Sequence, residues 1–449
     1  KKSILIKMLY YRVWLLLLYT ISKALVYNHE RTKPHQHDWD AIGVDPRIAN
    51  ALVSMGAKIP TQVQCRAIPK MLKGEDCVVH APTGSGKTLA YLVPIFNQIN
   101  PERQAIQAII VVPTRELGLQ VTAVARRLAS GTQTQSRIIV MPLLAGSKLR
   151  RQRLWAWASP PHIIIANAIQ LEQMIRLGGL KKMPDLRIFV VDEIDAFFDD
   201  ESLITDRNAL KASFLRLKDF TTKSNQRQHI FATATIEQPR YFVQSKLQDW
   251  CQGRQPLYIS IGSKRSPPST LSHFFTCCSE PSKRLTAARK ILKKRLLLQT
   301  ENTTIFSNVV TPPVLIFFDE SRPLHQFAQI FQRIDGHRVG ILTPDSDLDQ
   351  RAKALADFRS GRIDLLLATD LAARGLDLPQ IKFILNFDPP KNAVSYLHRA
   401  GRAGRMGNTG SVITIIHEKE RFAFERILNY CGLLDDLPPD ILLSSPVNT

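Results

Sequence analysis

Cysteine motifs and long apolar runs are both missing from this sequence of 449 residues. Its six cysteines are scattered, and no C-x-x-C pair occurs. This pattern argues against a disulfide framework and fits a reducing compartment. The adjacent Cys277 and Cys278 are more typical of neighbours on a strand than of a metal or redox site. The apolar stretch 13–21 is too short to span a bilayer comfortably, so we expect no requirement for a membrane.

Acidic residues are scarce relative to basic ones. The chain has 39 Asp and Glu against 60 Lys and Arg, which gives a net charge of +21 and a pI near 9.9. Such an excess predicts a polyanionic partner, most simply nucleic acid. A basic surface that is only solvated is the alternative.

Acid is absent altogether from the start of the chain, where no Asp or Glu precedes Glu30. A basic leader over residues 1–36, free of acid up to Glu30, favours import into an organelle, mitochondrion or plastid, over a cytoplasmic or nuclear location. A signal anchor and a mistranslated upstream stretch are the alternatives. We leave this segment out of the predicted fold.

Apolar strand-like runs alternate with helix-length patterns over residues 37–261, which predicts a parallel sheet covered on both faces. The expected strands are Ala108–Val112, Ile138–Leu143, Ile163–Ile165, Ile188–Val191, His229–Phe231 and Leu257–Ile261. Residues 262–271 are rich in Ser and Pro and are predicted to form a flexible linker.

The same alternation restarts over residues 272–449. The expected strands there are Val314–Phe318, Val339–Leu342, Leu365–Ala368, Phe383–Phe387 and Val412–Ile416. The fold class is therefore α/β, with two parallel-sheet domains of similar size in tandem.

A phosphate-binding loop is predicted at residues 81–88, Ala-Pro-Thr-Gly-Ser-Gly-Lys-Thr, between an apolar run and a helix. Its glycines let successive N–H groups converge on one point, and the helix N-terminus adds partial positive charge there. Lys87 would reach the β- and γ-phosphates, and the Thr88 hydroxyl would ligate Mg²⁺. An ordinary Gly/Ser turn is the alternative. The predicted nucleotide contacts in this loop are Thr83, Gly84, Ser85, Gly86, Lys87 and Thr88.

A carboxylate cluster, Asp192-Glu193-Ile194-Asp195, follows the apolar strand 188–191. Ligand sites of open parallel sheets lie at the carboxyl ends of the strands. Asp192 would hold Mg²⁺, and Glu193 would orient or deprotonate the attacking water. Alone, such a cluster is more often a helix start or a solvated turn. Together with the phosphate loop it predicts hydrolysis of a nucleoside triphosphate.

These motifs resemble those of the DEAD-box ATP-dependent RNA helicases, and the resemblance runs from Trp39 to Gly410. It implies two RecA-like domains, with ATP and Mg²⁺ as cofactors. Residues 60–64, Pro-Thr-Gln-Val-Gln, match the family's adenine-reading motif. The resemblance assigns adenine recognition to Gln64, Thr61 and the upstream Trp39, and a carboxamide can indeed donate and accept at the adenine edge.

Further matches imply an RNA site. Thr114 and Arg115 lie in a Pro-Thr-Arg-Glu-Leu motif, and Gly146 stands in the family's Gly-Gly position. Residues 367–377 match another motif, in which Thr369 would touch an RNA phosphate, Asp377 the ribose of ATP, and Arg374 would couple the two as part of the RNA site.

Residues 398–405 contain the family's H-R-x-G-R-x-G-R signature in full. By resemblance, Arg402 and Arg405 are arginine fingers for the γ-phosphoryl group. A solvated basic face is the alternative. The Thr-Ala-Thr motif at 233–235 resembles the family's Ser-Ala-Thr motif. The residues expected to couple the ATP state to RNA binding are Asp195, Thr233, Thr235, His398 and Arg399.

Two departures from the family's pattern stand out. Asn167-Ala168-Ile169-Gln170 replaces Thr-Pro-Gly-Arg, and Ile194 replaces the third-position Ala. They affect RNA-bending contacts more than ATP chemistry. We therefore expect an RNA-dependent ATPase that binds single-stranded RNA without reading its sequence, with possible protein cofactors, and that separates short duplexes or remodels RNA–protein complexes. An ATP-gated RNA clamp with weak or no unwinding is the alternative, and a DNA translocase is a second one that the Gln64 motif disfavours.

Overall fold

The computed structural model describes residues 39–434 with internal gaps. The gaps are 83, 133–136, 147–148, 181–182, 200–202, 219–226, 235–246, 248–249, 252, 262–266, 268–269, 301–312, 344–345, 347, 374–380 and 405–408. The predicted leader, 1–36, and most of the predicted linker lie outside the described residues. Within the described ranges, no helix combines the length and the apolar character that crossing a membrane requires.

The first domain is built on a seven-stranded sheet in the order β3-β4-β2-β5-β6-β1-β7, and every pairing is parallel. Its strands are β1 Cys77–His80, β2 Ala108–Val111, β3 Val140–Leu143, β4 Ile163–Ala166, β5 Ile188–Val191, β6 Gln228–Thr233 and β7 Leu257–Ser260. Apart from β7 and one position of β3, these short strands are buried throughout, as expected for strands covered on both faces.

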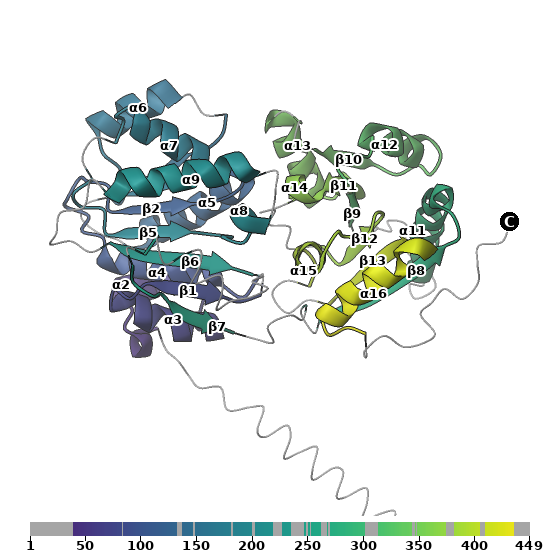
Figure 1. Ribbon diagram of the computed structural model, residues 1–449, viewed down its shortest axis with the longest axis horizontal. Helices are drawn as coiled ribbons and strands as arrows, with labels where there is room; N and C mark the ends of the chain where they lie inside the picture. The colour runs from purple at the N-terminus through teal and green to yellow at the C-terminus, as the bar shows by residue number, and fades with distance from the viewer. Residues whose placement is uncertain are drawn as a thin grey trace, which may run out of the picture.

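Helices cover both faces of this sheet (Figure 1). They are α2 Pro46–Ser54, α3 Gln62–Leu72, α4 Lys87–Gln98, α5 Arg115–Gly131, α6 Leu149–Ala158, α7 Ala168–Arg176, α8 Ala196–Asp199 and α9 Ile204–Lys218, with a 3-10 turn at Asp40–Ile42. Alternate strand residues feed two separate cores: Val79 packs in the core with α2 to α5, while Val78 packs in the core with α7 and α9. The predicted α/β fold is confirmed for this domain.

The second domain has a six-stranded, all-parallel sheet in the order β10-β11-β9-β12-β13-β8. Its strands are β8 Leu271–Cys278, β9 Val314–Phe318, β10 Val339–Leu342, β11 Leu365–Thr369, β12 Phe383–Asn386 and β13 Gly410–His417. Strand β8 was not among the predicted strands, and the predicted linker reaches its first residue. Cys277 and Cys278 end this strand, as the sequence indicated.

Helices again cover both faces of the second sheet. They are α11 Arg284–Thr300, α12 Leu324–Arg333, α13 Leu348–Arg359, α14 Asp370–Ala373, α15 Ala393–Ala400 and α16 Arg421–Tyr430, with 3-10 turns at Pro281–Lys283 and Glu418–Glu420.

The two domains lie side by side, with α13, α14 and α15 toward the first domain (Figure 1). Among the described residues, two charged-group contacts join them, and the second is an ion pair when its histidine is protonated. Arg351 of α13 lies 3.2 Å from Glu116 of α5, and His398 of α15 lies 3.2 Å from Asp195, which follows β5. Because the carboxyl ends of β2 and β5 lead into Glu116 and Asp195, the second domain faces the edge where ligand sites of such sheets form.

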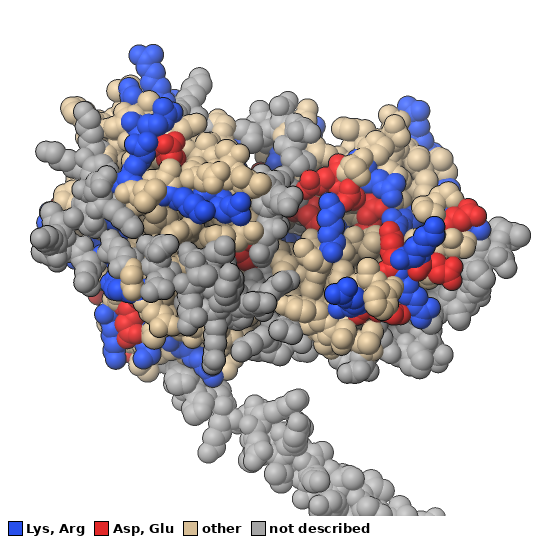
Figure 2. Space-filling model, viewed as in Figure 1, with Lys and Arg blue, Asp and Glu red and all other residues tan. Residues whose placement is uncertain are grey.

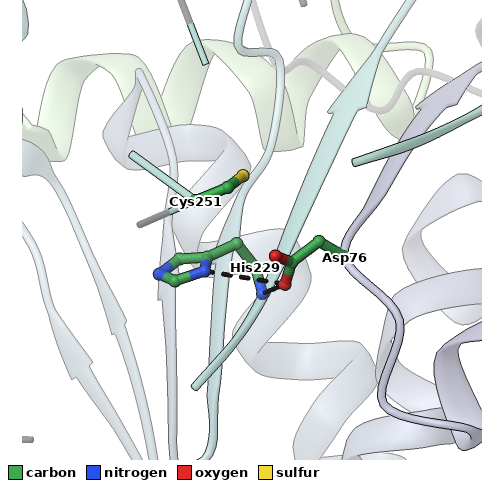
Figure 3. A group of neighbouring side chains, drawn as sticks. All are labelled: Asp76, His229 and Cys251. Carbon is green, nitrogen blue, oxygen red and sulfur yellow. Dashed lines mark hydrogen bonds and ion pairs between the residues drawn. The ribbon is translucent and has the colours of Figure 1, made fainter. Parts of the chain in front are cut away.

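At the opposite end of the first sheet, Asp76, His229 and Cys251 come close together (Figure 3). Their side chains are potential metal ligands, but the Asp76 carboxylate already has partners. It accepts a hydrogen bond from the backbone N–H of His229 at 2.6 Å and pairs with the Arg254 guanidinium at 3.0 Å. Burial lowers the pKa of His229 and raises that of Cys251 to about 12. We interpret the group as a structural brace that fixes the start of β1 to the start of β6.

Replacing Asp76 by Asn is expected to destabilise the first domain by about 3 kcal/mol, because Arg254 then loses the buried anion that it pairs with. Urea unfolding followed by circular dichroism measures this. Asp357→Asn is the control, since it breaks an ion pair whose partner, Arg362, has 69% of its side chain exposed, and such a pair contributes about 1 kcal/mol or less. Equal losses for the two variants would contradict the brace.

Candidate nucleotide and RNA site

The phosphate loop joins β1 to α4 through two glycines in the left-handed region, Gly84 at φ +77° and Gly86 at φ +96°. A Cβ on Gly86 would lie only 2.6 Å from the Gln64 side-chain nitrogen, so neither conformation nor space admits another residue there. Lys87 opens α4, and its ammonium donates to the carbonyls of Ala81 at 2.6 Å and Pro82 at 3.0 Å. The lysine thus lies folded against its own loop, within reach of any phosphate bound there.

Gln64 connects the predicted adenine motif to the phosphate loop. Its buried amide nitrogen donates to the Gly86 carbonyl at 3.1 Å, while its oxygen accepts from the Thr61 backbone N–H at 2.8 Å. Trp39 is buried beside this motif, and its indole N–H donates to the Ala57 carbonyl at 3.0 Å. Gln64 and Thr61 are thus held together, Trp39 is anchored separately at Ala57, and the contacts of all three with adenine stay a prediction.

The acidic cluster lies at the end of β5, as predicted. Asp192 is buried, and it accepts a hydrogen bond from the backbone N–H of Glu193 at 2.9 Å. Glu193 adopts φ +47°, and it is the only non-glycine residue with positive φ in the described part of the chain. Strained backbone of this kind concentrates at functional sites. The next residue, Ile194, donates its N–H to Ala232 of β6 at 3.0 Å, which holds the cluster against the sheet.

Burial raises the pKa of Asp192 to about 6, and the neighbouring negative charge of Glu193 adds to this shift. Hydrogen bonding from Tyr91 and the positive charge of Lys87 act in the opposite direction. The site therefore holds a carboxylate that is poorly compensated by the protein alone. A cation or a cationic side chain brought close to it would relieve that cost.

Tyr91 is a residue of this site that the sequence analysis missed. Its hydroxyl donates to Asp192 at 2.8 Å and is also hydrogen-bonded to Thr88. It therefore joins the two side chains that were predicted to hold Mg²⁺. Thr88 and Tyr91 lie three residues apart on α4 and so share a face of the helix. That spacing was the available signal. The hydroxyl and carboxylate oxygens of Thr88 and Asp192 are the donors that a hard cation such as Mg²⁺ prefers.

The Thr233–Ala234 segment lies directly beside the phosphate loop. The carbonyl of the buried Thr233 accepts from the Ala81 N–H at 3.2 Å. His80, at the end of β1, hydrogen-bonds the Ala234 carbonyl at 3.1 Å and the Tyr258 hydroxyl at 2.6 Å. His80 thus connects the phosphate-loop strand to the predicted coupling motif and to β7, and nothing in the sequence pattern pointed to it.

The predicted coupling residues of the second domain divide into two kinds. His398 reaches across and pairs with Asp195, as described above. Arg399 is held entirely within its own domain: it binds Asp370 through both carboxylate oxygens, at 2.6 and 2.8 Å, and its guanidinium lies 5.0 Å from the centre of the Phe317 ring. The coupling predicted for Arg399 would therefore act on the first domain indirectly, through the loop that Arg399 supports. Arg402 is buried and lines a small pocket that His398 and Asp370 also line.

The predicted RNA residues Thr114 and Gly146 of the first domain follow strand ends that a single side chain links. Asn167, after β4, accepts from the Ala145 N–H at 3.1 Å and donates to the Val112 carbonyl at 3.1 Å. It thereby holds the turns after β2 and β3, which carry Thr114 and Gly146. The departure from the family's Thr-Pro-Gly-Arg thus supplies a buried cross-link between these turns.

Other members of the RNA set have local roles. The Thr114 hydroxyl caps α5 by accepting from the Leu117 N–H, and Thr369 does the same for Ala372 at the start of α14. Gly146 adopts φ +78°, a conformation that favours glycine. Arg115 opens α5, next to the interdomain Glu116. The predicted residues Thr83, Thr235, Arg374, Asp377 and Arg405 lie outside the described residues.

Two parallel-sheet domains that present a phosphate loop and a carboxylate cluster to an arginine-bearing loop define a two-domain RecA-like nucleotide hydrolase. The sequence model of the DEAD/DEAH box helicases matches residues 61–241, and that of the helicase conserved C-terminal domain matches residues 293–407. The chain belongs to the DEAD-box ATP-dependent RNA helicases.

Two plant relatives match most of the chain. It is 34% identical over 395 residues to DEAD-box ATP-dependent RNA helicase 58, chloroplastic, of Arabidopsis thaliana, covering 86% of this chain and 80% of the relative. It is 36% identical over 383 residues to the protein of the same name from Oryza sativa subsp. japonica, covering 84% and 82%. The fold is similar to that of S. cerevisiae Dbp5 bound to RNA and ADP BeF3, with TM-score 0.73 at 22% identity over 88% of this chain and 94% of that one.

Replacing Tyr91 by Phe is expected to lower the ATPase kcat about tenfold, because the charged form of Asp192 loses a hydrogen bond. Since the Tyr91 hydroxyl lowers the pKa of Asp192, its removal raises that pKa. The acidic limb of the ATPase pH profile then moves to higher pH, and the Mg²⁺ concentration for half-maximal rate rises. Titrations of ATPase rate against pH and Mg²⁺ measure both effects.

The matched control is Tyr396→Phe. This tyrosine is equally buried, and its hydroxyl hydrogen-bonds His273 at 2.6 Å in the second domain, away from the carboxylate cluster. Its loss should cost stability and leave the pH limb and the Mg²⁺ dependence unchanged. If Tyr91→Phe leaves them unchanged as well, Tyr91 does not position Asp192.

Proposed function

We propose that this helicase hydrolyses ATP when RNA closes its two domains, and that closure separates short duplexes locally or remodels RNA–protein complexes. The observation that carries the proposal is the pair of interdomain contacts, His398 to Asp195 and Arg351 to Glu116, formed directly beside the predicted catalytic and RNA-binding residues. A hydrolysis site completed only by a second domain makes turnover depend on whatever brings the domains together.

The roles at the nucleotide follow from position. Lys87 neutralises the β- and γ-phosphates, and Glu193 orients or deprotonates the attacking water. Arg402 and Arg405 stabilise charge on the γ-phosphoryl group from the second domain. Thr88 and Asp192 hold Mg²⁺, which when bound supplies charge stabilisation at the phosphates. The adenine is read by Gln64, Thr61 and Trp39, and its ribose is bound by Asp377.

The RNA is held by its backbone. Thr114, Arg115, Gly146, Thr369 and Arg374 suit phosphates and 2′-hydroxyls rather than base edges, so binding is independent of sequence and sensitive to salt. RNA binding at Arg115 is coupled to domain closure through the next residue, Glu116, because Glu116 forms the interdomain ion pair with Arg351.

A second candidate function is an ATP-gated RNA clamp with weak or no unwinding. The specific observation in its favour is Asn167–Gln170, which removes the family's arginine from the first turn of α7. A strand-displacement assay on a short duplex separates the two: ATP-dependent displacement supports the helicase, and RNA-stimulated hydrolysis without displacement supports the clamp.

RNA coupling is tested by a cycle of Glu116→Gln, Arg351→Gln and the double variant. This ion pair is only 12–13% exposed, so each single change should raise the RNA concentration for half-maximal ATPase by about tenfold, and the double variant should be no worse than either single one. The rate without RNA should stay unchanged. Equal ATPase rates of the wild type with and without single-stranded RNA would overturn the coupling.

We also propose that the protein works in the plastid, with protein cofactors that select its RNA. The support is the word "chloroplastic" in the names of both plant relatives, together with the basic leader of residues 1–36. A fluorescent fusion of the full chain that stays outside plastids in plant cells would contradict the location.

A further inference from the structure

Helix α6 presents an outer face that packing does not explain. Its sequence is Leu-Arg-Arg-Gln-Arg-Leu-Trp-Ala-Trp-Ala, and Trp155 and Trp157 are 44% and 73% exposed, with Leu154 at 62%. The other described tryptophans, Trp39 and Trp250, are 1% and 7% exposed. Two exposed indoles, which flank the solvent side of one short helix because they stand two residues apart, are therefore an exception among the described tryptophans.

The inner face of α6 is fixed by separate residues. Gln152 donates to the Pro142 carbonyl of β3 at 2.8 Å, and Ala156 is buried. Arg153 lies against Gly179, which follows the neighbouring helix α7. These contacts hold the helix in place. Among the described residues, none of them involves the side chain of Trp155 or Trp157.

Each indole has a basic side chain in its own row along the helix. Arg150 and Trp157 lie seven residues apart and Arg151 and Trp155 four apart, so each pair lies along one side of the helix. Arg150 and Arg151 are exposed and stand in the first turn of α6. Positive charge at that end opposes the helix dipole and does not stabilise the helix. It therefore requires another explanation.

The surrounding sequence has an extreme charge bias. Between Glu116 and Glu172 there is no Asp or Glu. The basic residues in the same interval are Arg126, Arg127, Arg137, Lys148, Arg150, Arg151 and Arg153. Figure 2 shows Lys and Arg side chains gathered over the α6 and α7 end of the first domain. A surface of this kind matches a polyanion.

The position of α6 connects it to the predicted RNA site. The helix begins three residues after Gly146, at the edge strand β3, and packs beside α7, whose first residue follows Asn167. An RNA strand that contacts the Gly146 turn therefore has the first turn of α6, with Arg150 and Arg151, next to it, and the tryptophans lie further along the helix. Arginines that hold phosphates, beside aromatic rings that stack on bases, are the combination used to bind single-stranded nucleic acid.

We infer that the outer face of α6 is an extension of the RNA site, in which Arg150 and Arg151 hold phosphates and Trp155 and Trp157 stack on bases of the single strand beyond the core. The inference rests on the proposed RNA binding by the two-domain core. It gives this chain its own grip on flanking RNA, independent of domain closure, because every residue involved lies on one helix of the first domain.

The test measures binding of fluorescently labelled single-stranded RNAs from about 5 to about 16 nucleotides, with a non-hydrolysable ATP analogue. The wild type should gain affinity with length. Trp155→Ala/Trp157→Ala should lose about tenfold or more on the long RNAs and leave the shortest unchanged, and Trp155→Phe/Trp157→Phe should recover part of that loss. Phe422→Ala, an aromatic 73% exposed in the second domain, is the matched control and should change nothing.

Salt dependence gives a second readout. Arg150→Gln/Arg151→Gln should reduce the slope of log affinity against log salt on long RNA by about 1.4, the value for two phosphate contacts on a single strand. Arg333→Gln/Lys419→Gln removes the same charge from exposed positions of the second domain and should leave the slope unchanged.

The outcomes are distinguishable. Circular dichroism first checks that the tryptophan and arginine variants are folded. If these variants bind every RNA length as the wild type does, the inference is overturned. A face that binds a protein instead of RNA would give this same result. If the wild type itself fails to bind the shortest RNA in an ATP-dependent way, the proposed core function fails. A gain with length that only the α6 variants lose supports the inference.

Discussion

Every strand pairing described in both sheets is parallel, and this constraint places the whole site. In such a sheet all carboxyl ends meet at one edge, so the loops after β1, β2, β3, β4 and β5 emerge together. Those loops carry Lys87, which is predicted to bind phosphate, the first-domain residues predicted to contact RNA, and the carboxylate cluster. The second sheet obeys the same rule, and its α15 and α13 bring His398 and Arg351 to that edge.

The electrostatics of the edge explain why two domains are needed. A buried Asp192 with a pKa near 6 and a strained Glu193 are costly for the first domain alone. Lys87, in turn, is held by carbonyls of its own loop. In the proposed mechanism, positive charge from the second domain and from a metal bound with the nucleotide would complete this arrangement. A site that is unfavourable when open and compensated when closed is suited to couple hydrolysis to closure.

The departures from the family's pattern are informative when their contacts are known. Asn167 supplies a polar cross-link among three strand ends, where the sequence alone suggested only a lost arginine. The α6 face adds arginine and tryptophan to the same side of the domain. Under the proposed function, the lost arginine would reduce the contacts that bend RNA, while the α6 face would enlarge the surface that holds a single strand. That combination would suit a protein that binds single-stranded RNA tightly and bends it little.

The sequence by itself determined the fold class and the chemical parts. Strand and helix periodicities are local, and the phosphate loop, the carboxylate cluster and the H-R-x-G-R-x-G-R signature are contiguous, so the chain alone displays them. The sequence analysis did not predict strand β8, because a half-exposed strand lacks a continuous apolar run. The sequence analysis missed four contact residues for another reason: Tyr91, His80, Asn167 and Arg351. Their roles are pairwise contacts between segments 21 to 235 residues apart, and only the packing of helices against a sheet decides which distant side chains meet.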